Sequence, residues 1–155
     1  MKIKHVFLLS LLCLWFVFTS VSCKRQASVR TRKKAKQKLD ELSKIMLFSF
    51  PASTRLLGYE RRRGMNDVIY LKIEIATEDL RALINNSPFC NTILRSSENN
   101  PISDISSTGP TWWKVKSVRT WKSGQVRLDN ANYLNMLIDL DQKNKCVIYL
   151  EWFET

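Results

Sequence analysis

The chain has 155 residues, which allows one domain once an N-terminal targeting segment and a linker are set aside. Its 45% hydrophobic and 10% aromatic residues exclude a disordered chain and indicate a folded body with a core. The formal net charge of +11 gathers at one end: residues 1–45 carry eleven Lys and Arg against two acidic residues, whereas residues 46–155 carry fourteen against twelve, a nearly neutral balance that argues against nucleic acid as a partner.

The first 23 residues have the pattern of an export signal. Lys2 and Lys4 precede an uncharged, largely apolar run over residues 6–21. This run is shorter than the roughly twenty residues that a membrane-spanning helix needs, and the small residues Ser20 and Ser22 follow its apolar part. The pattern therefore predicts a signal peptide.

The segment Ser20-Val21-Ser22-Cys23 resembles a bacterial lipobox, with Ser20 at the position where a lipobox usually has Leu. The resemblance covers only these first 23 residues, and it implies that Cys23 receives lipid after cleavage and that the protein is membrane-anchored at the cell envelope. Simple secretion is an alternative. An uncleaved anchor is another, because the basic residues that follow Cys23 would prefer the cytoplasmic side of a membrane.

Residues 24–45 are interpreted as a basic linker followed by a helix. The stretch from Lys24 to Lys38 has no apolar periodicity, which is typical of a solvated spacer, and it could also adhere to anionic lipid head groups. Leu39, Leu42 and Ile45 recur at helical spacing, which predicts a membrane-proximal helix over residues 34–47. Residues 46–155 are predicted to form a single domain.

The domain begins with alternating segments. Residues 55–61 and 68–76 are predicted as two strands joined by a hairpin turn, and Thr77 to Asn86 as a short helix. Residues 95–110 are rich in Ser, Asn, Gly and Pro and are predicted as a long loop, functional or mobile.

Further strands follow the loop. Residues 115–128 are predicted to contain one or two short strands, and residues 133–141 and 146–153 two strong ones. The last is apolar on both sides, which predicts a central position in the sheet. The expected class is α+β, an antiparallel sheet of four to six strands with one short helix packed on a face; the mature domain resembles no characterised family.

Two cysteines, Cys90 and Cys146, remain in the domain once Cys13 and Cys23 are assigned to the targeting segment. In an oxidising compartment such a pair suggests a disulfide. The alternative is two separate buried thiols, since free cysteine is among the most buried residue types.

Catalytic machinery is scarce in the domain. The single histidine is His5, which excludes Ser-His-Asp and Cys-His catalysis and argues against a zinc site, and the four glycines form no phosphate-binding motif. Asp139 and Asp141 share one side of a predicted strand and could form a carboxylate pair or a calcium site; alternatively, Asp141 belongs to the turn. No metal or cofactor is expected.

Aromatic residues are the other candidates for function. Trp112, Trp113 and Trp121 could form a contact surface for a ligand or partner beneath the long loop, although such residues are more often core. Arg61, Arg62 and Arg63 are interpreted as a solvated hairpin tip, with binding of an acidic partner as the alternative. The sequence thus predicts a non-enzymatic, membrane-tethered or exported protein that binds an unknown protein or small ligand; a small carboxylate-dependent hydrolase and an inhibitor or immunity-type protein are the alternatives.

Overall fold

The computed structural model describes residues 31–97, 105–129 and 131–155. The chain divides into two compact units, Met1–Lys38 and Leu39–Thr155. Residues 31–38 of the first unit are helical. The predicted export signal, with the lipobox-like Cys23, lies outside the described residues.

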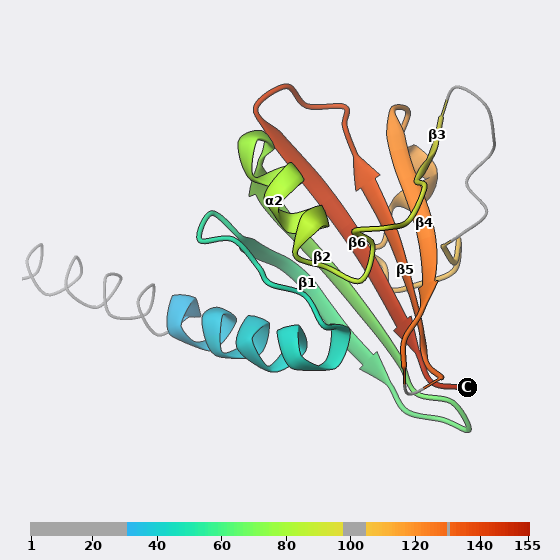
Figure 1. Ribbon diagram of the computed structural model, residues 1–155. Helices are drawn as coiled ribbons and strands as arrows, with labels where there is room; N and C mark the ends of the chain where they lie inside the picture. The colour runs from blue at the N-terminus through green and yellow to red at the C-terminus, as the bar shows by residue number, and fades with distance from the viewer. Residues whose placement is uncertain (1–30, 98–104, 130) are drawn as a thin grey trace, which may run out of the picture. The chain divides into compact units, whose positions relative to one another are not determined.

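The second unit is built on one six-stranded sheet whose neighbouring strands are all antiparallel (Figure 1). This confirms the predicted antiparallel sheet. The strands lie in the order β1-β2-β6-β5-β4-β3. Strand β6, whose residues are apolar on both faces, is therefore central, as its composition predicts. The strand bounds are β1 Arg55–Arg62, β2 Val68–Ala76, β3 Arg95–Ser96, β4 Trp121–Arg127, β5 Tyr133–Asp139 and β6 Lys145–Phe153.

Short helices connect and cover the strands. Residues 39–46 are helical, and η1 (Thr77–Asp79) with α2 (Leu80–Asn85) occupies the predicted helix after β2. A strand beginning at Val115 was expected, but the structure has a 3-10 turn there, η2 (Val115–Ser117). Val115 and Val118 are both buried, and residues three apart lie on the same side of a 3-10 turn.

The first apolar cluster lies between one face of the sheet and the helices. In Figure 1, α2 lies in front of the strands. Leu42 and Met46 enter this cluster from the helical residues, and Leu83 enters it from α2. The unit therefore begins at Leu39, earlier than residue 46, because these helical residues belong to its core.

The second cluster lies between the opposite face and the segment 105–118, which passes behind the sheet in Figure 1. Trp113 is its centre: the indole makes edge contacts with Tyr70 at 5.1 Å and with Tyr149 at 5.2 Å between ring centroids. The part of the predicted loop that the structure describes at residues 105–110 is thus packed on the sheet, and residues 95–96 pair as β3.

Both edges of the sheet depart from a long regular strand. β3 has two residues, and the pairing of β1 with β2 is irregular between Leu56 and Gly58. At Gly58 the ring of Trp112 lies so close that an added Cβ would be 2.7 Å from Cε3, so glycine is required by the close approach of the aromatic ring.

The predicted disulfide is not formed, because Cys90 and Cys146 are free thiols in this structure. Cys146 is buried opposite Ile75 of β2 in the first cluster. Cys90 is exposed and adjoins Phe89, which packs near Gly124 on β4. The chain after α2 therefore runs toward β4, two strands away from β6 in the sheet.

Candidate ligand-binding site

A row of polar side chains crosses four neighbouring strands on the second face. Gln125 of β4 is opposite Asn135 of β5, Asn135 is opposite Glu151 of β6, and Glu151 is opposite Tyr70 of β2. Residues opposite each other on antiparallel strands share a face and are close neighbours. Asn135 and Glu151 are each only 5% exposed, so the middle of the row is buried.

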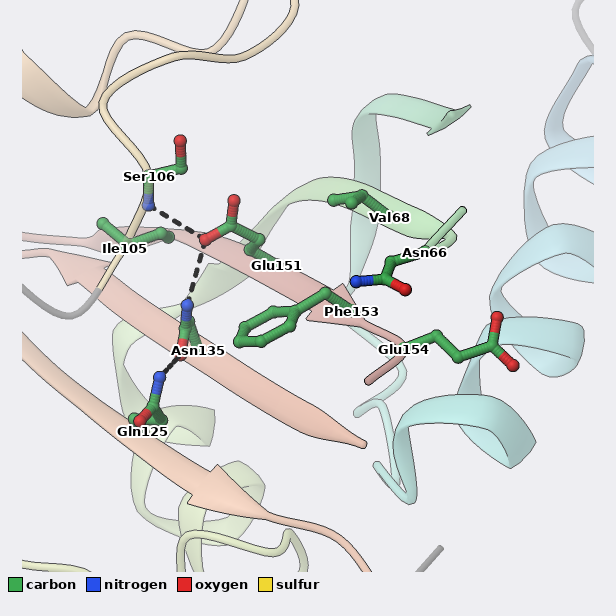
Figure 2. Close-up of a pocket in the computed structure, with 9 residues that line it drawn as sticks. All are labelled: Asn66, Val68, Ile105, Ser106, Gln125, Asn135, Glu151, Phe153 and Glu154. Atoms are coloured by element: carbon green, nitrogen blue, oxygen red, sulfur yellow. Dashed lines mark hydrogen bonds between the residues drawn. The ribbon is translucent and has the colours of Figure 1, made fainter. Parts of the chain in front are cut away.

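Hydrogen bonds join this polar row into a chain (Figure 2). Gln125 Nε2 donates to Asn135 Oδ1 at 2.8 Å, and Asn135 Nδ2 donates to Glu151 Oε2 at 3.0 Å. The backbone N–H of Ser106 donates to the same Oε2 at 2.9 Å. Figure 2 draws no hydrogen bond to the second carboxylate oxygen, Oε1.

The loop above the row is held by two hydrogen bonds to the sheet face and one within the segment 105–118. Besides the bond between Ser106 and Glu151, Trp113 Nε1 donates to the Ser106 carbonyl at 2.9 Å, and the Tyr70 hydroxyl donates to the Thr108 carbonyl at 3.3 Å. Buried aromatic side chains thus use their polar ends to fix the backbone. The result is a wall of defined shape beside Glu151.

A pocket of about 380 Å³ opens beside the polar row. A volume of this size is within the range of small-molecule sites. Glu151 and Asn135 contribute buried polar groups to it, while Val68, Ile105 and Phe153 contribute apolar surface. The remaining lining residues are Asn66, Ser106, Gln125 and Glu154.

The charged side chains that line the pocket are both acidic. Glu151 and Glu154 both line it, and none of its nine lining residues is Lys or Arg. Burial raises the pKa of Tyr70, and the negative charge of Glu151 raises it further. The nearby Arg62 lies over the Tyr70 ring, 5.1 Å from its centroid, and forms an ion pair with Glu60 at 2.7 Å.

The tryptophans that the sequence proposes as contacts do not line this pocket. Trp113 and Trp121 are 6% and 4% exposed and belong to the second apolar cluster, so they are core residues and not a contact surface. Trp112 is partly buried against the same cluster and against Gly58. Of the three, Trp112 alone is partly and not fully buried.

The aspartate pair is engaged in turn structure. Asp141 accepts the backbone N–H groups of Arg119 and Thr120, and these two hydrogen bonds lower its pKa. Asp139 in turn accepts the N–H of Asp141 at 3.0 Å. The structure therefore gives both carboxylates a local role in fixing the chain, as the turn interpretation expects. Within residues 31–97, 105–129 and 131–155, no three His, Cys, Asp or Glu residues converge as metal ligands would.

Arg61, Arg62 and Arg63 lie at the end of β1, where the hairpin to β2 begins. Arg61 pairs with Asp67, which keeps the pKa of that carboxyl below its usual range, and Arg62 pairs with Glu60. Arg63 is exposed. This arrangement agrees with a solvated tip.

No protein-family model matches the chain, and comparisons with curated proteins and with solved structures give no match. In the described part of the chain, no helix has the length and apolar character to cross a bilayer. The site must therefore be interpreted from its own geometry.

Sequence reasoning missed Glu151, Asn135 and Gln125. A signal was present, because Glu151 is the one acidic residue inside the apolar strand from Cys146 to Phe153. Charged residues are almost never fully buried without a specific partner or role, so a carboxylate in a central strand marks a position worth testing.

Proposed function

We propose that this protein is a non-enzymatic binding protein, exported and tethered at the cell envelope through its N-terminal segment, with its recognition site at the Glu151 pocket. The lipobox-like sequence around Cys23 supports the tether, and the basic residues that follow Cys23 suit a spacer ahead of the helical residues 31–46, the proposed membrane-proximal helix. The absence of histidine from residues 6–155 supports binding over acid–base catalysis.

The observation that carries the proposed site is the burial of Glu151 and Asn135 in the middle of a sheet face. Desolvating a carboxylate is costly, and apolar residues at these positions would stabilise the sheet at least as well. Sequences depart from such local preferences mainly at functional sites. The pocket beside Glu151 and Asn135 offers a functional reason for burying these two polar residues: they can bind a ligand there.

The site can be tested by NMR on the full-length, ¹⁵N-labelled protein with a panel of cationic, anionic and neutral small probes. We expect the probes that bind to shift the backbone amides of Ser106, Asn135 and Glu151. Val68→Trp should abolish these shifts, because a large ring at this lining position fills the pocket and leaves the polar row intact.

Ile93→Trp is the matched control for that variant, since it makes a similar aliphatic-to-indole change at a residue that is 94% exposed and does not line the pocket. Shifts that persist in Val68→Trp, or a panel that leaves all three amides unmoved, would contradict the proposed site.

A further inference from the structure

We propose that the ligand of this pocket presents an aliphatic ammonium group, as a lysine side chain or a free alkylamine does. The inference rests on the proposed binding function and adds the chemical class of the ligand to it. Three properties of the pocket support it: the direction of its hydrogen bonds, its charge and its apolar wall.

The direction of the hydrogen bonds is set by Glu151. The carboxylate accepts at Oε2, so Asn135 must turn its NH₂ group toward Glu151 and its carbonyl oxygen toward Gln125. Gln125 must then donate through Nε2, which leaves its own Oε1 as the free end of the chain. The Glu151 end of the row therefore offers the acceptor Oε1, while the Gln125 end offers its Oε1 and the second N–H of Nε2. A ligand that meets Glu151 must bring a donor.

The charge of the pocket selects a positively charged donor. Glu151 and Glu154 line it without a Lys or Arg among the lining residues, and the neighbouring Arg62 is paired with Glu60. A charged donor gives a stronger hydrogen bond to a carboxylate than a neutral one does. A calcium ion is a poorer fit, because it takes six to eight oxygen ligands and only two carboxylates line this pocket.

The apolar wall suits a methylene stem. Val68, Ile105 and Phe153 line the pocket beside the acceptors, and Phe153 is held by stacking on Tyr133 with 5.4 Å between ring centroids. An alkylammonium can rest its stem on such a wall while its three N–H groups point at oxygens. An aromatic face also attracts a cation within about 6 Å.

The test uses three probes of nearly equal size on the full-length, ¹⁵N-labelled protein: n-butylamine, n-butanol and butyrate. We expect butylamine to shift the amides of Ser106, Asn135 and Glu151 and to bind at least about tenfold more tightly than butanol, with no binding of butyrate. If butanol or butyrate binds the pocket as well as butylamine, the ammonium inference is wrong and the proposed site stands. If no probe moves these amides, both fail.

Substitutions test the same point from the protein side. Glu151→Gln keeps an acceptor for Ser106 and Asn135 but turns an NH₂ group toward the pocket, so butylamine binding should fall by at least about tenfold. Glu78→Gln is the matched control, since Glu78 is exposed past the opposite end of β2 and does not line the pocket, and it should leave binding unchanged. Unchanged binding in Glu151→Gln would overturn the inference.

Asn66→Asp tests the inference even if Glu151→Gln fails to fold. Asn66 is an exposed lining residue, so the change adds a carboxylate without disturbing the core, and it should tighten butylamine binding by about two- to fivefold. Weaker or equal binding would count against an ammonium ligand. Comparing Nα-acetyl-lysine methylamide with cadaverine then shows whether the pocket prefers a lysine of a polypeptide or a free amine.

Discussion

Tyr149 lies beneath Trp113 in the second cluster and is 3% exposed. Burial, followed by the nearby negative charge of Asp139, raises the pKa of Tyr149 to about 12. In the unfolded chain a tyrosine ionises near its ordinary value of about 10. The folded state is therefore at no disadvantage below pH 10, and it loses stability as the pH rises from 10 through 12.

Tyr149→Phe should remove this loss, which is on the order of 2 kcal/mol by pH 12. Lys72 lies over the Tyr149 ring at 4.9 Å, and burial lowers the pKa of Lys72. Because Lys72 is present in both the parent protein and Tyr149→Phe, its titration is largely common to the two proteins. Urea unfolding at pH 8, 10 and 11.5 measures the effect. Parallel pH profiles for the two proteins would show that Tyr149 titrates normally.

The surroundings of Glu151 could not be predicted from the sequence pattern. The apolar run of the last strand predicts a central position correctly, but it does not say which neighbours surround a lone carboxylate. That depends on register: Asn135 and Ser106 reach Glu151 across the sheet and from the loop, at separations of 16 and 45 residues. No local sequence pattern encodes those contacts.

At the scale of elements, the helical residues 39–46 contribute directly to the core. Leu42 is fully buried in the first cluster, whereas Leu47, just past this helical segment, is 53% exposed. Leu42→Ala should therefore destabilise the domain by about 3 kcal/mol, through lost burial and the cavity left behind. Leu47→Ala makes the same chemical change at an exposed site and should cost less than about 0.5 kcal/mol.

Urea unfolding followed by circular dichroism compares these two variants with the parent. Equal stability of Leu42→Ala and the parent would mean that the segment does not pack on the sheet in solution.

Most strands could be predicted from a local pattern: β2 alternates and was placed at its observed bounds, and β6 is apolar on both sides. The 3-10 turn at Val115 and the two-residue β3 were missed for a common reason. Both are short, and their conformation follows from packing: Val115 is buried in the second cluster, and β3 exists by pairing with Lys122 and Ser123 of β4. The bridge between Cys90 and Cys146 was mistaken because the path of the chain after α2 is a tertiary property.

At the scale of the whole molecule, the proposed tether makes a separate prediction. If Cys23 is the lipidation site, Cys23→Ala should move the protein from the membrane fraction to the soluble fraction. Cys90→Ala, which removes an exposed thiol of the domain, should leave it at the membrane. Intact mass of the mature protein distinguishes cleavage and lipidation. A Cys23→Ala protein that stays membrane-bound and uncleaved would instead identify an anchor.

The central place of β6 governs the order in which the chain can fold. β6 pairs with β2 on one side and β5 on the other, yet it leaves the ribosome after the five other strands. Without residues 145–153, the hairpin β1–β2 and the strands β3–β4–β5 have no strand to join them, and isolated hairpins are marginal in water. The two parts of the sheet can therefore join only when residues 145–153 are present to pair with both β2 and β5.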